Sequence, residues 1–205
     1  MKNLIITISR QYGSGGRKIG QRLSEELGIP FYDSEIIDLA AKESGLAADF
    51  IRGQEQQLTQ SLLFSLVTNF TSNAGAFNPN MLSLSDQVYL AQAKAIRALA
   101  DKGPCVIVGR NADYILKDRE DALHVYVFAD TPYRAERIVR LYGDSEKSPE
   151  QRLAEKDKRR RVNYQHYTGR TWGQAQNYDI CLDTGVLGIE QCKNIVVDII
   201  KNSKE

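Results

Sequence analysis

The sequence predicts an α/β fold in which a five-stranded parallel sheet carries helices on both faces. Short, β-branched apolar runs alternate with segments of helical periodicity along the 205 residues, which is typical of parallel sheets with helical crossovers. The runs are almost continuously apolar, as expected for strands buried on both faces. A glycine-rich stretch directly follows the first run, and in such folds ligands bind beyond the carboxyl ends of the strands.

The predicted strands are short apolar runs that end at polar residues. They lie at residues 3–8, 29–33, 105–110, 122–129 and 178–184. The carboxyl ends of parallel strands meet at one edge of a sheet, so the polar residues at these ends are expected near the site. These residues are Ser9, Asp33, Arg110, Asp130 and Asp183.

Segments with helical spacing separate the strands. Ile19, Leu23 and Leu27 recur after the glycine-rich stretch, and Gly28 ends that helix. Ser34 caps the next one. Further helices are expected over 84–102, from Thr131, over 148–165 and over 188–200.

The composition is that of a globular cytoplasmic protein. The net charge is +1, which argues against a general affinity for nucleic acid or membrane surfaces. The three cysteines are odd in number and lack metal-like spacing, so we expect buried, reduced thiols. The N-terminal apolar run is too short for a signal peptide, and no stretch reaches the roughly 18 apolar residues of a membrane span.

The stretch "SRQYGSGGRKIG", residues 9–20, predicts an anion site. A strand, then glycines, then a helix directs backbone N–H groups and a helix N-terminus at one point. The dinucleotide fingerprint G-x-G-x-x-G fits Gly13 and Gly15 but places Lys18 at its third glycine, although Asp33 lies about where the ribose-binding acid belongs. A plain glycine turn is the third interpretation.

The phosphate-loop motif G-x-x-x-x-G-K-[ST] fits the stretch in two registers. If Gly15 is its second glycine, Gly16 takes the lysine position and Arg17 the hydroxyl position. If Gly16 is the second glycine, Arg17 and Lys18 take these positions. Neither register supplies the hydroxyl group that normally contacts Mg²⁺, and only the second supplies a cation for the phosphates.

Several motifs together resemble the cytidylate kinase-like family, a branch of the P-loop nucleoside monophosphate kinases. They occur in family order and span nearly the whole chain, with the poorest match at about 45–100. They read "TISRQYGSGGRKIGQRLSEELGIPFYD", "VIVGRNADYIL", "YRAERI", "KDKRRRVNYQHYTGRTWG" and "NYDICLDTGVLGIE".

The resemblance implies a single-domain P-loop kinase fold of three layers and an ATP-dependent transferase. It implies a core at 1–33, 101–141 and 173–205, a helical acceptor-binding insertion at about 34–100, and a lid at about 142–172. The lid excludes water, which would otherwise accept the phosphoryl group. Mg²⁺ is expected to arrive with ATP and keep several waters, oriented by Asp33 or Asp130; the sequence shows no metal-ligand cluster.

The resemblance also implies roles for individual residues. The backbone of Gly13–Gly16 is expected to surround the ATP phosphates, with Arg17, or alternatively Lys18, as the cation. Arg17, Arg159 and Arg161 are the expected catalytic residues. The expected ATP-binding residues are Gly13, Ser14, Gly15, Gly16, Arg17 and Lys18. The expected acceptor-binding residues are Asp33, Ser34, Arg110, Asp113 and Lys156.

Two departures from the family pattern concern the acceptor. Leu39 stands where true cytidylate kinases have an arginine that contacts the acceptor phosphate, and Arg160 replaces an aspartate at the acceptor sugar. The acceptor is therefore expected to be a nucleoside monophosphate or a related small molecule, not necessarily cytidine monophosphate. The sequence does not determine the oligomeric state.

Other residues near these motifs have two interpretations each. Arg134 and Arg137 either reach ATP or pair with acids such as Glu136. Tyr164, Tyr167 and Trp172 either stack on a base or pin the lid loop. His124 is expected in the core. A catalytically silent nucleotide-binding protein, a nucleic-acid binder using "KDKRRR" and a dehydrogenase are the competing functions.

Overall fold

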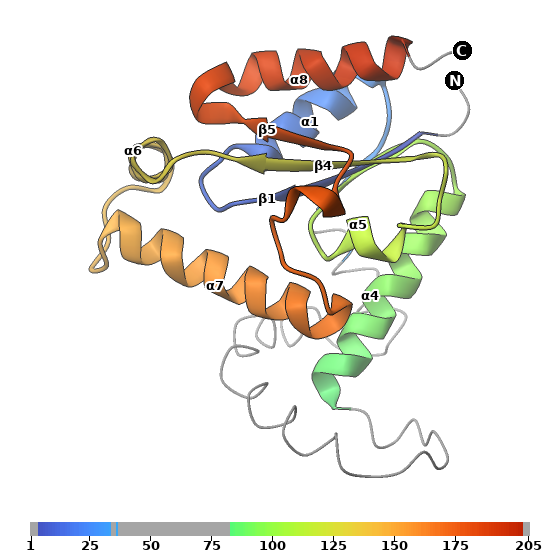
Figure 1. Ribbon diagram of the computed structural model, residues 1–205, viewed down its shortest axis with the longest axis horizontal. Coiled ribbons are helices and arrows are strands. Elements are labelled where there is room, and N and C mark those ends of the chain that lie inside the picture. The colour runs from blue at the N-terminus through green and yellow to red at the C-terminus, as the bar shows by residue number, and fades with distance from the viewer. Residues whose placement is uncertain (1–3, 34–35, 37–82, 203–205) are drawn as a thin grey trace.

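A five-stranded parallel sheet forms the centre of the molecule, with strand order β2-β3-β1-β4-β5 (Figure 1). This computed structural model describes residues 4–33, 36 and 83–202. The strands are β1 (Ile5–Arg10), β2 (Phe31–Tyr32), β3 (Cys105–Val108), β4 (Ala122–Phe128) and β5 (Ile180–Asp183). The predicted fold class is confirmed.

Helices cover both faces of the sheet (Figure 1). α1 (Gly16–Leu27) and α8 (Thr184–Asn202) pack on one face, and α4 (Leu84–Asp101) and α5 (Ala112–Ile115) on the other. Successive side chains of a strand point to opposite faces. Ile6 of β1 therefore joins the apolar cluster beneath α1 and α8, whereas Ile5 joins the cluster beneath α4 and α5.

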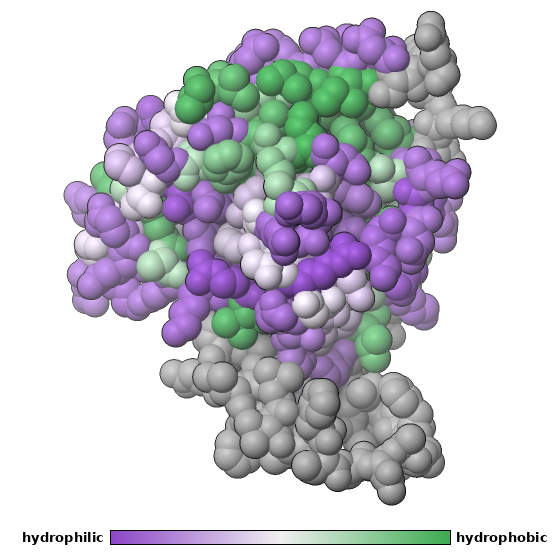
Figure 2. Space-filling model, in the orientation of Figure 1, coloured by the Kyte–Doolittle hydropathy of each residue, from purple (hydrophilic) through white to green (hydrophobic). Residues whose placement is uncertain are grey.

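Two further helices, α6 (Thr131–Tyr142) and α7 (Pro149–Thr168), follow β4. Asp130 caps α6 by accepting a hydrogen bond from the Tyr133 N–H. Ser148 and Gln151 form a capping box at the start of α7. α7 has a mostly hydrophilic outer surface (Figure 2), as its charged sequence predicts.

Most predicted helices are confirmed, with changes at three places. α7 extends to Thr168 into the predicted loop, which also contains a short 3₁₀ helix, η2 (Ala175–Asn177). α8 begins earlier than predicted, at Thr184, and has a kink at Gly188. α5 was not predicted, because its four residues are too few for a periodic pattern.

The predicted interior residues are largely confirmed. His124 is buried, and its Nδ1 lies 2.7 Å from the Thr7 Oγ1; burial lowers the pKa of this imidazole. The three cysteines are free thiols, two of them buried and Cys181 half-buried. Within the described part of the chain, no helix has the length and apolar character to cross a membrane. Most of the predicted insertion at 34–100 lies outside the described residues, so its boundaries stay predictions.

Candidate functional site

The glycine-rich stretch forms the turn between β1 and α1. Gly13 and Gly15 have φ angles of 81° and 94°, left-handed values that favour glycine. Gly15 is the N-cap of α1 and Gly16 its first residue. The first backbone N–H groups of a helix have no partner within it and attract anions. The turn therefore has the strand–loop–helix geometry that the predicted anion site requires.

The loop is tied to the ends of neighbouring elements. The Ser14 hydroxyl is fully buried and lies 2.9 Å from the Gln11 carbonyl oxygen and 3.1 Å from that of Val127. The Thr184 hydroxyl donates a hydrogen bond of 2.6 Å to the Ser14 carbonyl oxygen. The Gln11 N–H bonds the Val127 carbonyl at 3.0 Å. These bonds hold the loop backbone in place before any ligand arrives, with the Ser14 side chain serving as an anchor.

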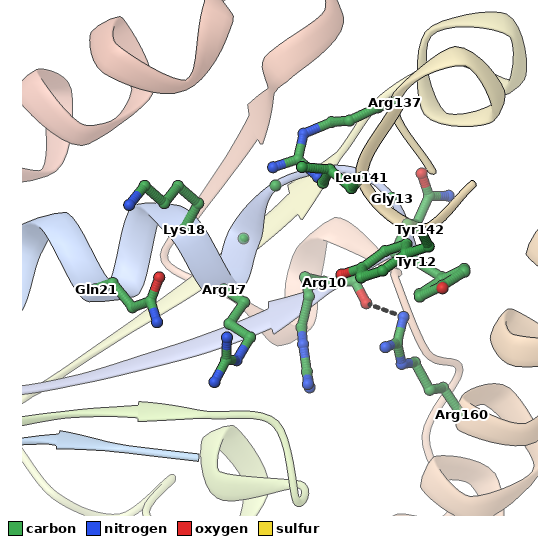
Figure 3. Close-up of a pocket in the computed structure, with 13 residues that line it drawn as sticks. Arg10, Tyr12, Gly13, Arg17, Lys18, Gln21, Arg137, Leu141, Tyr142 and Arg160 are labelled. Atoms are coloured by element: carbon green, nitrogen blue, oxygen red, sulfur yellow. Dashed lines mark hydrogen bonds between the residues drawn. The ribbon is translucent and has the colours of Figure 1, made fainter. Parts of the chain in front are cut away.

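A cavity of about 300 Å³ lies against the loop (Figure 3). α6 and α7 contribute to its wall together with the loop and α1. Its basic lining residues are Arg10, Arg17, Lys18, Arg137 and Arg160. The described residues that line it include no acidic side chain. Such a concentration of positive charge around loop N–H groups fits a multiply charged anion.

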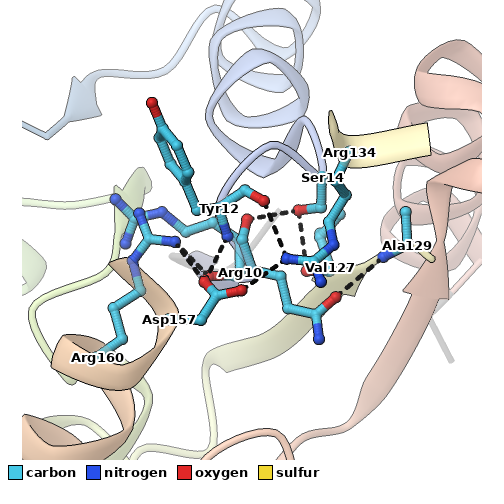
Figure 4. A network of polar contacts seen from close by, with 9 residues as sticks. Arg10, Tyr12, Ser14, Val127, Ala129, Arg134, Asp157 and Arg160 are labelled. Carbon is cyan, nitrogen blue, oxygen red and sulfur yellow. Dashed lines mark hydrogen bonds and ion pairs between the residues drawn. The ribbon is translucent and has the colours of Figure 1, made fainter. Parts of the chain in front are cut away.

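Asp157 connects α7 to the loop (Figure 4). Its carboxylate accepts hydrogen bonds from the Tyr12 N–H at 2.7 Å and from the Arg134 guanidinium at 2.6 Å. The side chains of Asp157 and Arg134 are each only 9% exposed. Arg134 therefore pairs with an acid, as one interpretation proposed, but the acid is Asp157 and not Glu136.

Arg160 is the α7 arginine that lines the cavity. Its guanidinium donates to the Arg10 carbonyl oxygen at 3.2 Å and to Asp157 at 3.3 Å, and lies 5.7 Å from the centre of the Tyr12 ring. Lys156 and Arg161 are exposed and Arg159 is half-buried. The structure does not bring these three predicted residues to the cavity, and their contact with a phosphate stays a prediction.

Asp33 lies at the end of β2 beside two arginines. Its carboxylate accepts a 2.6 Å bond from the Arg17 Nε and lies 4.0 Å from the Arg10 guanidinium. The structure therefore brings Asp33 together with Arg17, which the sequence analysis placed on the acceptor and ATP sides respectively. Ser34 and Leu39 lie outside the described residues.

Arg110 follows β3 in an unusual backbone conformation. Arg110 and Asn111 have φ angles of 59° and 56°, the two non-glycine residues with positive φ in the described part of the chain. Asparagine tolerates this conformation, whereas arginine adopts it rarely. The Asn111 side chain donates a 3.0 Å hydrogen bond to Asn163 of α7. Such strain concentrates at functional sites, which favours a functional role for Arg110.

Asp113 is buried on α5, and it is not among the residues that line the cavity. It accepts a 2.7 Å hydrogen bond from the buried Tyr164 hydroxyl of α7. Burial raises the pKa of Asp113 to about 6. Tyr167 stacks on Tyr89 with ring centres 3.8 Å apart. These contacts favour the interpretation that Tyr164 and Tyr167 hold α7 in place over stacking on a base.

The family model of the cytidylate kinase-like family matches residues 5–186. The chain belongs to this family. A cytidylate kinase from Pyrobaculum aerophilum is 24% identical over 197 residues, covering 95% of this chain and 91% of the relative.

Solved structures share the fold of this cytidylate kinase-like protein. An uncharacterized protein from Eubacterium ventriosum has a TM-score of 0.71 and 23% identity, covering 98% of this chain and 99% of that one. A shikimate kinase from Bacteroides thetaiotaomicron has a TM-score of 0.57 and 8% identity, covering 97% and 98%. The predicted family and the P-loop kinase fold are confirmed, and together they support a nucleotide kinase.

Three arginines that line the cavity of this cytidylate kinase-like protein were not predicted as ATP-phosphate ligands from the sequence alone. The sequence analysis gave Arg10 no role, because the first strand was predicted at residues 3–8, whereas β1 continues to Arg10. Arg137 had two interpretations, and it lines the cavity. Arg160 was predicted to replace an aspartate at the acceptor sugar, on the basis of the family resemblance. Arg160 lies three residues after Asp157 on α7, so the two side chains are neighbours on the helix surface. Since Asp157 faces the loop, Arg160 faces it as well.

Proposed function

We propose that this protein is an ATP- and Mg²⁺-dependent phosphotransferase that transfers the γ-phosphoryl group to a nucleoside monophosphate or a related small acceptor. The observation that carries the proposal is the cavity against the loop, whose lining combines loop backbone with five cationic side chains. Phosphoryl transfer needs alignment and positive charge around the moving group more than covalent help from protein. The family membership agrees with this reaction class.

The chain offers a donor side and an acceptor side. The N–H groups of Gly13–Gly16 would hold the ATP phosphates. Arg110 would hold the acceptor, since it lies at the carboxyl end of β3 in a strained conformation. Arg17, Arg159 and Arg161 remain the proposed catalytic cations, and Asp33, Ser34, Asp113 and Lys156 the further proposed acceptor residues. α7, held to the loop by Asp157, would limit the access of water.

Mg²⁺ fits the site as a companion of ATP. Within the described ranges, no group of three or more His, Cys, Asp or Glu side chains is placed to hold a metal ion. The carboxylates of Asp33 and Asp130 bond Arg17 and the Tyr133 N–H. The ion would therefore be held mainly by phosphate oxygens and water, which suits Mg²⁺. When bound, it neutralises charge on the phosphate oxygens.

The test is a panel of nucleoside monophosphates and small alcohols, each incubated with ATP and Mg²⁺ while ADP release is measured. One acceptor is expected to stimulate ADP release strongly. We expect Arg110→Met to raise the KM for that acceptor more than the KM for ATP. Arg119→Met serves as the matched control, because Arg119 pairs with Asp101 and Asp121 away from the cavity. No turnover with any acceptor and no ATP hydrolysis would contradict the proposal.

A catalytically silent nucleotide-binding protein is the second candidate. The absence of the usual lysine and hydroxyl from the phosphate-loop motif favours it. Tight ATP binding without turnover across the whole panel would support this candidate over the kinase.

A further inference from the structure

The start of α1 helps to choose between the two registers of the phosphate-loop motif. The helix begins at Gly16 with Gly15 as its N-cap, which corresponds to the register in which Gly15 is the second glycine. Counting back, the first glycine position of the motif falls on Arg10, the last residue of β1. In this register arginine stands where the motif has its first glycine, and Gly16 stands where it has lysine.

The two exchanged residues are in contact. A Cβ atom on Gly16 would lie 2.6 Å from the Arg10 Cβ and 3.1 Å from its Cγ. The stem of Arg10 thus occupies the space that a side chain at position 16 would need. Because the closest contact is with the Arg10 Cβ, a lysine at position 16 would require either glycine at position 10 or a shift of the backbone, so the two departures from the motif compensate each other.

The other end of the Arg10 side chain also lies against a glycine. A Cβ atom on Gly109 would overlap the Arg10 guanidinium, and Gly109 has a positive φ of 80°. Gly109 directly precedes Arg110 at the end of β3. The Arg10 side chain is 15% exposed and lines the cavity beside the loop glycines. Its charge therefore lies between the phosphate loop and the proposed acceptor residue.

The alternative cations are placed differently. Arg17 is 57% exposed on its side-chain surface and bonds Asp33 at 2.6 Å, whereas the Arg10 guanidinium lies 4.0 Å from the same carboxylate, so Asp33 neutralises more of the charge of Arg17 than of Arg10. Lys18 is exposed and extends to the opposite side of α1 from Arg10 and Arg17 (Figure 3). Arg10 is the less exposed of the two arginines, and less contact with water strengthens a charge–phosphate interaction.

We propose that Arg10 supplies, from the strand side of the loop, the phosphate-binding charge that the motif's lysine normally supplies from the helix side. Gly16 lacks a side chain so that Arg10 can enter. The ligand group is the β- and γ-phosphate chain of a nucleoside triphosphate, which a guanidinium can contact through two N–H groups. This inference rests on the proposed function, because it requires ATP to bind at the loop.

The first test compares neutral variants by calorimetric titration with ATP. Arg10→Met keeps an aliphatic stem over Gly16 but removes the charge, and we expect it to weaken ATP binding about tenfold or more. Arg17→Met is expected to weaken binding less. Arg22→Met is the matched control on α1, because Arg22 pairs with Glu190 and does not line the cavity. Circular dichroism verifies that each variant is folded.

The second test restores the motif's residues at positions 10 and 16 and measures ATP binding. Gly16→Lys alone is expected to abolish ATP binding, because the new side chain meets Arg10. The double variant Arg10→Gly/Gly16→Lys restores the motif at both positions and is expected to recover binding at least about tenfold over Gly16→Lys.

Three outcomes separate this inference from the proposed function. Absence of ATP binding by the unsubstituted protein would overturn the proposed function and this inference with it. Wild-type affinity in a folded Arg10→Met variant, or a larger loss in Arg17→Met, would overturn the assignment of Arg10 alone. A double variant no better than Gly16→Lys would likewise contradict the compensated exchange.

Discussion

Asp113 is a buried carboxyl whose proton is coupled to folding. Burial raises its pKa from 3.8 to about 6, while the hydrogen bond from Tyr164 acts in the opposite direction. The folded protein therefore binds this proton more tightly than the unfolded chain does. The resulting stabilisation is complete at low pH and is lost as the pH rises through about 6.

We expect Asp113→Asn to remove this pH dependence while keeping an acceptor for Tyr164. The unfolding free energy of the wild type, relative to the variant, should fall by about 3 kcal/mol between about pH 3.5 and pH 7. Urea unfolding at several pH values measures it. The exposed Asp118→Asn controls for the loss of one carboxylate. If the unfolding free energies of the wild type and Asp113→Asn changed with pH in parallel, this account of Asp113 would be wrong.

The Asp157 carboxylate joins α7 to the phosphate loop by accepting a hydrogen bond from the Tyr12 N–H, and joins α7 to α6 through its ion pair with Arg134. A buried ion pair is costly to break from one side, because the remaining charge loses its partner. We expect Asp157→Asn to lower the unfolding free energy by about 3 kcal/mol, measured by urea unfolding.

The same helix provides the control for this prediction. Glu155 forms an exposed ion pair with Lys147 at 2.6 Å, so Glu155→Gln is expected to change stability far less. Arg134→Met combined with Asp157→Leu replaces both charges and is expected to cost less than Asp157→Asn alone. Equal losses in Asp157→Asn and Glu155→Gln would show that burial of the pair does not matter.

The elements differ in how far the sequence could predict them. Continuous apolar runs and helical spacing identified the five strands and the long helices, because burial on a sheet imposes these patterns. α5 follows two residues with positive φ, which no periodicity reveals. The charged run in α7 suggested both a solvated face and a lid. Only the packing of Asp157 and Arg160 against the loop distinguishes the buried charges from the exposed ones.

A ligand that binds only the folded state stabilises the entire fold. We expect ATP at about 100 times its Kd to raise the unfolding free energy by about 2.7 kcal/mol. Adenosine lacks phosphates. At the same concentration as ATP it is expected to stabilise the fold much less, because the lining of the cavity is dominated by cations. Thermal and urea unfolding with each compound measure this. Equal stabilisation by adenosine would mean that the phosphates are not what is recognised.

The whole site was only partly predictable for a physical reason. The loop could be located because the strand–glycine–helix order is a local sequence pattern, whereas the lid and the role of Arg110 stay predictions from the family resemblance. Whether Arg10 or Arg17 supplies the phosphate-binding charge could not be predicted from the sequence. The answer depends on the contacts of Arg10 with Gly16 and Gly109, which belong to different parts of the chain.

The phosphate loop continues directly from β1, and β1 pairs with β3 on one side and β4 on the other. Backbone amides in a doubly paired central strand exchange their hydrogens only when the whole domain unfolds. The base of the loop is therefore attached to the part of the molecule that opens last. On warming, nucleotide binding is expected to persist until the sheet itself is lost, so that the two disappear in a single cooperative transition.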